Sequence, residues 1–484
     1  MIIALINVSG RLSTEGSRLI SALLVRAGHS VKSVFLARKI PLLYEQKEIE
    51  RLHEILRGVD LVMIAVYSLF AVRAVQITRF IHKNYPGMKV IWGGPHCISA
   101  PELSLRYADA VCFAEGDQVI VDFVNKIEGG IDHTDTPNMA FNINGENYIN
   151  NVLPPFSDLD SLPFPDYDLD NQFLLDQELY QMTRDLFIRY STQYPFTTPT
   201  LWILTSRGCP HRCSYCNNCR YISMHGRNPM RFRSVDNFIS ELEHALRTLD
   251  FFERVGFGDD DFLMRPMGQL EDFAEKYKDK IGLPFLIGAS ANTYKKEKME
   301  ILLDAGIEVL QIGVQSGSQR VLDEVFDRKI SITKTMNTVR RIEPFYKTHG
   351  LQLILDFIID TPYETEDDII QTYYCLINIP QHVRINVFVL TFFPGSPIYD
   401  RALDDGYIEP FSEKTFRHYS SHNIIYQNNY ATFLVVIVQT LRHLKLLQYI
   451  PRRALDVLGS TSVRGAAAIV PEPVYAFLIK IFRR

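Results

Sequence analysis

The sequence has no apolar stretch long enough to cross a membrane as one helix, which takes about 20 residues. Its best candidate, ATFLVVIVQTL at 431–441, reaches only about half that length. The chain also lacks basic residues ahead of its first apolar run, so we expect no signal peptide. These two absences favour a cytoplasmic protein.

The chain as a whole has no excess of positive charge. Lysine and arginine number 51 against 56 aspartate and glutamate, for a formal net charge of -5. A nucleic-acid partner is therefore not expected, since such proteins carry a basic surface. The exception is local: from 420 to 484, eight lysine or arginine residues face only Asp456 and Glu472. This basic, apolar end predicts either a helical cap or a peripheral contact with an anionic membrane.

Cysteines are too few for a disulfide framework, with seven in 484 residues. Four of them lie in GCPHRCSYCNNC, at Cys209, Cys213, Cys216 and Cys219. A structural zinc site usually joins two CxxC knuckles, and the sequence has no second knuckle. A CxxxCxxC loop instead suits an iron–sulfur cluster, in which three thiolates hold three corners of a cubane and leave the fourth iron open. The spacing alone leaves Cys219 as a possible fourth ligand.

Short apolar runs alternate with helical patterns from residue 1 to 128. The runs predict five parallel strands covered by helices on both faces, at 2–8, 31–37, 60–68, 89–94 and 110–116. This is a doubly wound, Rossmann-like sheet, which binds ligands at the carboxyl ends of its strands. A GxGxxG motif is absent, so a dinucleotide is not expected. Residues 129–200, with an Asn-Gly turn and a Pro/Asp-rich stretch, are expected to form a linker.

A second alternation begins at residue 201. Six apolar runs predict the strands of a partial (β/α)6 barrel over 201–400, at 201–206, 254–258, 284–290, 309–314, 351–360 and 385–393. Barrel chemistry occurs at the carboxyl ends of the strands, and the cysteine stretch directly follows the first of them. Residues 401–484 are expected to form a small helical C-terminal region.

The cysteine stretch, CPHRCSYC after a first barrel strand, resembles the radical S-adenosylmethionine (SAM) superfamily. The resemblance implies a 4Fe-4S cluster on Cys209, Cys213 and Cys216, with SAM chelating the open iron. Reductive cleavage of SAM would then give a 5'-deoxyadenosyl radical, with an external electron donor such as flavodoxin or ferredoxin. Cys219 becomes a bystander, because a closed cluster could not hold SAM.

Four later segments resemble the family's remaining motifs, in the same order: VGFGDDDF, LQIGVQSGSQRVL, LDFIIDTPYET and FVLTFFPGSPIYD. Gln315 stands where the family commonly has glutamate, which keeps the reach but loses the charge. The simpler alternatives are a solvated turn for the three aspartates and a helix cap for Ser316. The residues implied to contact SAM are Tyr215, Asp259, Asp260, Gln315, Ser316, Asp356 and Ile359.

A doubly wound domain ahead of such a barrel resembles the cobalamin (B12)-binding radical SAM enzymes. The DxHxxG motif of a histidine-ligated cobalamin is absent after the first strand, so we expect no histidine ligand to cobalt. The alternative is a domain that has lost its ligand and serves as a lid. The residues implied to contact cobalamin are Asn7, Ser9, Ser68, Leu69, Phe70, Gly93, Gly94, His96, Glu115 and Gly116.

The resemblance predicts an enzyme that methylates an unactivated carbon of a hydrophobic, lipid-like or natural-product molecule. A cobalamin-dependent rearrangement or cyclisation without methyl transfer is one alternative. An iron–sulfur and corrin sensor without turnover is another. The sequence assigns neither the substrate nor a general acid or base.

Overall fold

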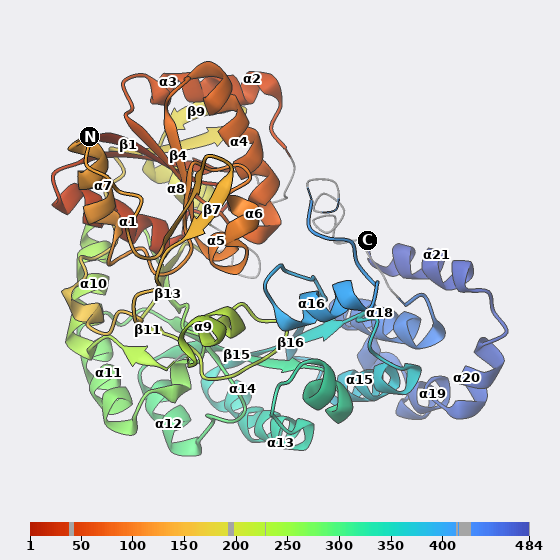
Figure 1. Ribbon diagram of the computed structural model, residues 1–484. Coiled ribbons are helices and arrows are strands. Elements are labelled where there is room, and N and C mark those ends of the chain that lie inside the picture. Colours follow the sequence, from red (N-terminus) through yellow and green to blue (C-terminus); the bar gives the residue numbers. More distant parts are fainter. Residues whose placement is uncertain (38–42, 192–197, 228, 413–414, 416–426, 484) are drawn as a thin grey trace.

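A computed structural model describes residues 1–37, 43–191, 198–227, 229–412, 415 and 427–483 (Figure 1). The predicted α/β organisation is confirmed: a mainly parallel sheet, a partial barrel and a set of C-terminal helices follow one another along the chain. Residues 413–414 and 416–426 of the expected C-terminal region lie outside the described residues.

The five predicted strands form the parallel centre of the first sheet, in the order β5-β4-β3-β1-β2. Apolar side chains of α1 and α7 pack on one face, and those of α2, η1, α3 and α4 pack on the other, as a doubly wound sheet requires. The strands are β1 (Ile2–Asn7), β2 (Ser30–Leu36), β3 (Leu61–Ala65), β4 (Lys89–Gly93) and β5 (Ala110–Cys112). The helical elements are α1 (Glu15–Arg26), α2 (Gln46–Ile49), η1 (Glu50–Leu52), α3 (His53–Leu56), η2 (Ser68–Phe70), α4 (Ala71–Asn84), α5 (Pro95–Ser99), α6 (Pro101–Ser104) and α7 (Ile120–Glu128).

The segment expected to be a linker contributes four strands to this sheet, so that expectation was wrong over much of its length. The hairpin of β6 (Met139–Ile143) and β7 (Glu146–Ile149) joins β5 antiparallel. At the opposite edge, β8 (Gln172–Asp176) pairs with β2 and is followed by β9 (Glu178–Gln181). The remaining elements of this segment are η3 (Leu159–Ser161) and α8 (Arg184–Ser191).

The six predicted barrel strands form a parallel sheet in chain order, β10-β13-β14-β15-β16-β17. Because β10 and β17 are its two edges, the barrel is open on one side. The strands are β10 (Thr200–Ile203), β13 (Arg254–Phe257), β14 (Phe285–Ala289), β15 (Ile307–Gln315), β16 (Gln352–Ile359) and β17 (Arg384–Val389). The connecting elements are β11 (Ser206–Arg207), α9 (Asn218–His225), β12 (Arg231–Phe232), α10 (Val235–Thr248), η4 (Phe262–Met264), α11 (Met267–Lys280), α12 (Lys296–Asp304), η5 (Val321–Val325), α13 (Ile332–Ile342), α14 (Pro344–His349), α15 (Glu366–Asn378) and α16 (Pro397–Asp404).

The C-terminal helices pack on the barrel through α18, which contacts both α15 and α21. Buried Arg442 at the end of α18 anchors this packing, since its guanidinium donates to the carbonyl oxygens of Ile379 (2.7 Å), Pro380 (2.8 Å) and Val383 (2.8 Å). None of the described helices is by itself long and apolar enough to cross a membrane, although α20 and α21, which meet at a 109° bend, qualify together. The elements are α18 (Tyr430–His443), η6 (Leu447–Tyr449), α19 (Arg452–Leu458), α20 (Thr461–Ala467) and α21 (Glu472–Arg483).

The first domain lies over the carboxyl end of the barrel strands (Figure 1). Arg231 of β12 donates to Glu115 after β5 at 2.7 Å, and Arg207 of β11 pairs with Asp117. Gly395, with φ of 79°, fits directly against Ser99 of α5: a Cβ there would lie 2.2 Å from the Ser99 carbonyl oxygen. The carboxyl edges of both sheets therefore face each other.

Candidate functional site

The cysteine loop lies between β11 and α9, at the carboxyl end of the barrel. Cys213 is buried, and Cys209 and Cys216 are half-buried; all three are free thiols. Burial raises the pKa of Cys209 to about 12 and also raises that of Cys216, so thiolates here need a positive partner. No three His, Cys, Asp or Glu side chains of the described chain converge on a single metal-ion site. A cubane suits this arrangement, because each thiolate binds a different iron.

Cys219 occupies the first turn of α9 and points back at the loop. Its thiol donates to the carbonyl oxygen of Cys213 at 3.0 Å. Burial raises the pKa of Cys219 to about 11, which keeps the thiol protonated for this hydrogen bond. The contact gives Cys219 a structural role within the loop and supports the prediction that it is a bystander.

The aspartates after β13 have different partners. Asp259 accepts the backbone N–H groups of Thr205 and Ser206, both at 2.7 Å, and the Thr205 hydroxyl. It therefore holds the segment that leads into the cysteine loop. Among the described residues, Asp260 accepts a hydrogen bond from Asn218 Nδ2 at 3.1 Å, and its charge contributes to the raised pKa of Cys209. Asp260 is thus the aspartate that faces the cysteines.

Asp261, the third of these aspartates, binds backbone N–H groups of its own turn and of a neighbouring strand end. It accepts from the N–H of Leu263 and from the N–H of Ser290, both at 3.1 Å. These contacts join the start of η4 to the end of β14. Of the three aspartates, Asp260 is therefore the candidate for a SAM contact, whereas Asp259 and Asp261 hold the local backbone.

Tyr215 and Gln315 meet around an arginine that carries no motif in the sequence. Arg328 donates to the Tyr215 hydroxyl at 3.0 Å and to the Gly313 carbonyl oxygen at 2.8 Å. Gln315 ends β15 with φ of 73°, and its side chain folds over Gly313, where a Cβ would lie 2.5 Å from Gln315 Nε2. Gly313 thus makes room for both long side chains beside the cysteine loop.

Ser316 and Ile359 turn their side chains away from this space, so a contact with SAM at either position would come from the backbone. Ser316 is fully buried, with its hydroxyl 3.4 Å from that of Thr372 on α15. Ile359 is packed in the core beneath the helices. Because side chains alternate along a strand, its neighbour Ile358 faces the opposite way and lines the cavity.

One cavity of 2420 Å³ connects these elements. It runs from the carboxyl edge of the first domain, past Tyr215 and Gln315, through the barrel to the C-terminal helices. A pocket for one small ligand usually measures about 300–1,000 Å³. This cavity is large enough for two cofactors and a substrate. Its lining at the first domain consists of Arg11, Ser13, Glu15 and Leu69.

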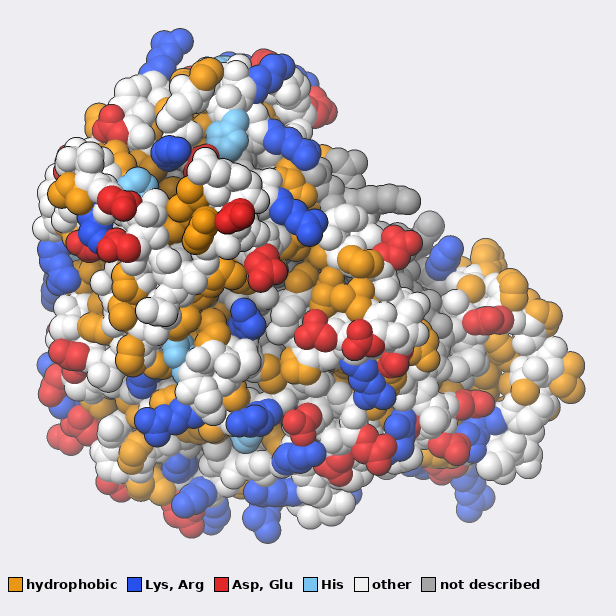
Figure 2. All heavy atoms as spheres, viewed as in Figure 1, with side chains coloured by type: hydrophobic (Ala, Val, Ile, Leu, Met, Phe, Trp, Pro, Cys, Tyr) orange, Lys and Arg blue, Asp and Glu red, His pale blue; other side chains and the backbone are white. Residues whose placement is uncertain are grey.

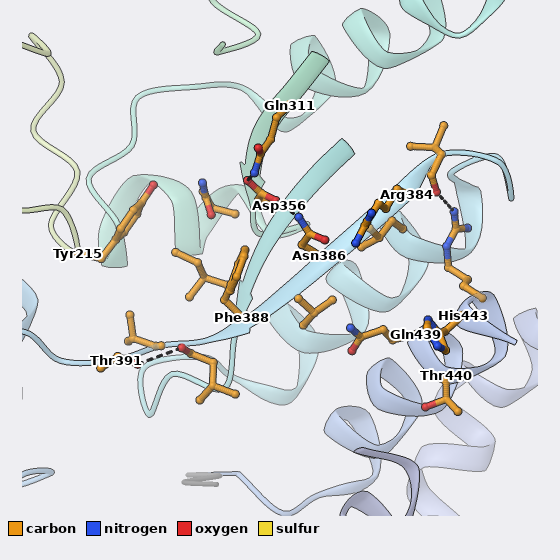
Figure 3. Close-up of a pocket in the computed structure, with 18 of the residues that line it drawn as sticks. Tyr215, Gln311, Asp356, Arg384, Asn386, Phe388, Thr391, Gln439, Thr440 and His443 are labelled. Atoms are coloured by element: carbon orange, nitrogen blue, oxygen red, sulfur yellow. Dashed lines mark hydrogen bonds between the residues drawn. The ribbon is translucent and has the colours of Figure 1, made fainter. Parts of the chain in front are cut away.

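A row of polar side chains crosses the inner wall of the barrel on β15, β16 and β17 (Figure 3). Asp356 accepts from Gln311 Nε2 at 2.6 Å and from Asn386 Nδ2 at 2.9 Å. Burial raises the pKa of Asp356. One pleat nearer the cysteines, Ile358 and Phe388 form an apolar layer of the same wall. Of these three residues, only Asp356 belongs to a motif, because its two amide partners come together with it only in the folded sheet.

Most of the candidate cobalamin residues are engaged in contacts within the protein. Asn7 and Ser9 are buried and bonded to each other at 2.6 Å. His96 is 1% exposed, lies 3.1 Å from the Ser68 hydroxyl and packs on Phe411; burial lowers its pKa to about 4, so it is neutral. His96 therefore does not reach the cavity.

The other residues expected to contact cobalamin either contact neighbouring side chains or are half-buried at the carboxyl edge of the first sheet. Glu115 pairs with Arg231, and Gly116 packs near Cys112 Sγ. Gly93, Gly94, Leu69 and Phe70 are half-buried, and Leu69 lines the cavity. Leu69 and Phe70 belong to η2 and are the large apolar candidates at this edge. Arg11 and Ser13 also line the cavity, but they were not predicted from the sequence because their loop carries no motif.

Two family models match the chain: the B12 binding domain over residues 1–124 and the radical SAM superfamily over residues 203–374. An uncharacterized methyltransferase of Pyrococcus horikoshii is 24% identical over 394 residues, covering 79% of this chain and 77% of that protein. The cytidylyl-2-hydroxyethylphosphonate methyltransferase of Streptomyces wedmorensis is 22% identical over 302 residues, covering 56% of this chain and 52% of that protein.

A solved structure shares the fold. It is the radical SAM methyltransferase TsrM from Kitasatospora setae with cobalamin and a 4Fe-4S cluster bound, and it superposes with a TM-score of 0.64 at 14% identity. The superposition covers 84% of this chain and 75% of that chain. The C-terminal helices from Tyr430 onward lie outside both family-model matches.

Proposed function

Because it joins a B12 binding domain to a radical SAM domain, the chain belongs to the cobalamin-binding radical SAM enzymes, and we propose that it methylates an unactivated carbon of a hydrophobic or natural-product molecule. The observation that carries this proposal is the continuous cavity. It joins the first domain at Leu69 to Tyr215 beside the cysteine loop and to Asp356 inside the barrel. A methyl carrier, SAM and a substrate can therefore meet in one continuous cavity.

The cofactors are those of the family: a 4Fe-4S cluster, SAM and cobalamin. When bound, the cluster delivers the electron that cleaves SAM, and cobalamin carries the methyl group. Cys209, Cys213 and Cys216 would hold the cluster, and Asp260 and Gln315 would face SAM. Members of this superfamily take their electron from an external donor, and we propose a flavodoxin or ferredoxin for this role. We further propose that the enzyme works in the cytoplasm, peripheral to the membrane.

The two products of SAM separate the candidate reactions. Anaerobically reconstituted protein, given cobalamin, a reductant and a substrate, is expected to form both 5'-deoxyadenosine and S-adenosylhomocysteine, measured by liquid chromatography. Formation of 5'-deoxyadenosine alone would indicate rearrangement or cyclisation. The absence of both products, with cluster and cobalamin intact, would contradict an enzymatic role. Cys213→Ala protein is the control for background cleavage.

We propose that the Gln311–Asp356–Asn386 row binds the polar group of the substrate. Both amides donate to the Asp356 carboxylate, so their carbonyl oxygens remain as acceptors for a hydroxyl or amine. The apolar layer of Ile358 and Phe388 lies two residues closer to the cysteines, or about 7 Å along the strands. This spacing would leave an apolar substrate carbon between the polar row and the cofactors.

Binding of SAM without substrate tests this assignment. Asp356→Asn is expected to change SAM affinity and uncoupled formation of 5'-deoxyadenosine by less than about twofold, because no SAM contact is lost. Gln315→Ala is expected to weaken SAM binding about tenfold, the effect of one lost hydrogen bond. Equilibrium dialysis measures both, with Asp272→Asn on the outer helix α11 as the control. A tenfold loss in Asp356→Asn would place that residue at SAM instead.

A further inference from the structure

Large hydrophobic side chains are exposed mainly at the C-terminal end of the molecule. Among the described residues, ten of the nineteen that are exposed lie between Leu444 and Ile481. Figure 2 shows hydrophobic side chains gathered over α20 and α21. Five of them follow the bend between these helices and the outer side of α21, and we call these the C-terminal apolar patch: Ile469, Val470, Val474, Phe477 and Ile481.

Helix α21 has two apolar faces, and among the described residues only one of them packs against another element. Tyr475 and Ile479 are buried against Val436 of α18. Val474, Phe477 and Ile481 recur at helical spacing on the other side and are 43%, 64% and 50% exposed. A helix that is apolar all round is normally buried all round. The outer face of α21 therefore has the character of a binding surface.

The patch is continuous with the cavity. Ile481 belongs to the patch and also lines the cavity, next to Phe482 and opposite Leu444 and Thr440 of the α18 end. The open side of the barrel, beside β17, thus leads directly to the exposed apolar surface. Anything that covers this surface also controls entry to the substrate space.

The exposed charges at this end of the molecule favour an anionic surface. Lys445, Arg453 and Lys480 are exposed, and in the described part of the chain no ion pair is formed by them. Lys445 also lines the cavity. The chain as a whole carries a net charge of -5, so this positive end is a local feature. Basic side chains beside apolar ones are the combination that holds a helix in the interface of an anionic bilayer.

We propose that the enzyme docks on an anionic phospholipid bilayer through the C-terminal apolar patch and takes its substrate from that bilayer through the open side of the barrel. The bend of 109° between α20 and α21 lets both short helices lie in the interface. A protein partner on this surface would cover the entrance, whereas a fluid lipid surface leaves it open. The substrate class, which rests on the proposed function, is an amphiphile whose apolar body dissolves in the membrane and whose polar group reaches the row at Asp356.

Vesicle flotation of the full-length, cluster-loaded protein tests the docking. The protein is expected to float with phosphatidylcholine–phosphatidylglycerol vesicles and much less with phosphatidylcholine alone. The double variant Ile469→Asp/Phe477→Asp is expected to float at least about tenfold less. Two apolar side chains that would be buried in the bilayer are replaced by negative charges, which the anionic lipids repel. The matched control is Val25→Asp/Ile131→Asp, which alters two side chains of the first domain that are 52% and 60% exposed.

Three results would overturn the docking. They are no flotation of the unchanged protein, equal flotation of both double variants, or a dimer in solution that Ile469→Asp/Phe477→Asp converts to a monomer. Cluster content and uncoupled SAM cleavage are expected to be the same in all variants, which verifies the fold. Flotation without S-adenosylhomocysteine formation would contradict the proposed methylation and leave the docking intact. Methylation by a protein that does not float with vesicles would contradict the docking and leave the proposed methylation intact.

Discussion

Cys213→Ala is expected to remove the iron–sulfur cluster and with it all cleavage of SAM, whereas Cys219→Ala is expected to retain both. Cys213 is the buried, central thiol of the CxxxCxxC loop, and without it two thiolates would have to hold a cubane. Cys219 contributes a hydrogen bond to the Cys213 carbonyl, worth about 1 kcal/mol. Its loss should loosen the first turn of α9 without removing a ligand.

Iron and sulfide content per chain, the spectrum of the reduced cluster and 5'-deoxyadenosine formation measure this difference. Cys375→Ala on α15 is the matched control, because that thiol lies next to Met336 and away from the loop. A Cys219→Ala protein that loses its cluster would make Cys219 the fourth ligand. The open iron, and therefore the SAM chemistry, would then be ruled out.

Asp259→Ala is expected to lower the free energy of unfolding by roughly 3 kcal/mol or more, because it leaves several buried donors unpaired. The carboxylate accepts from the backbone of Thr205 and Ser206, which are 0% and 5% exposed. These residues join β10 to the cysteine loop, so the variant should also hold less iron. Asp259→Asn keeps one carbonyl acceptor and should lose about 1 kcal/mol.

Thermal unfolding of the cluster-free protein separates stability from cofactor loss. The neighbouring variant Asp260→Ala removes only the hydrogen bond from Asn218 and should change stability by less than about 1 kcal/mol. Its effect should fall on SAM affinity instead. If Asp260→Ala proved the more destabilising of the two, the roles assigned to these adjacent carboxylates would be reversed.

The sequence by itself determined both alternations of strand and helix and the position of the cysteine loop. Five apolar runs of the first domain and six of the barrel became strands within a few residues of their expected bounds. Buried parallel strands are continuous apolar runs, and such runs are visible without any partner. The cysteine spacing is equally local, because three ligands fit in one short loop.

Only the tertiary structure decided which side chains share a space. Adjacent residues such as Asp259 and Asp260 look alike in sequence, yet one holds backbone and the other faces the cysteines. The row at Asp356 comes from three strands, and the edge strands β6 and β8 depend on neighbours far away in the chain. In the part of the chain that the structure describes, α18 covers one apolar face of α21 and the outer face stays exposed. The periodicity of apolar residues determines which face of a helix or strand a residue occupies. Packing between distant parts of the chain determines what lies opposite that face.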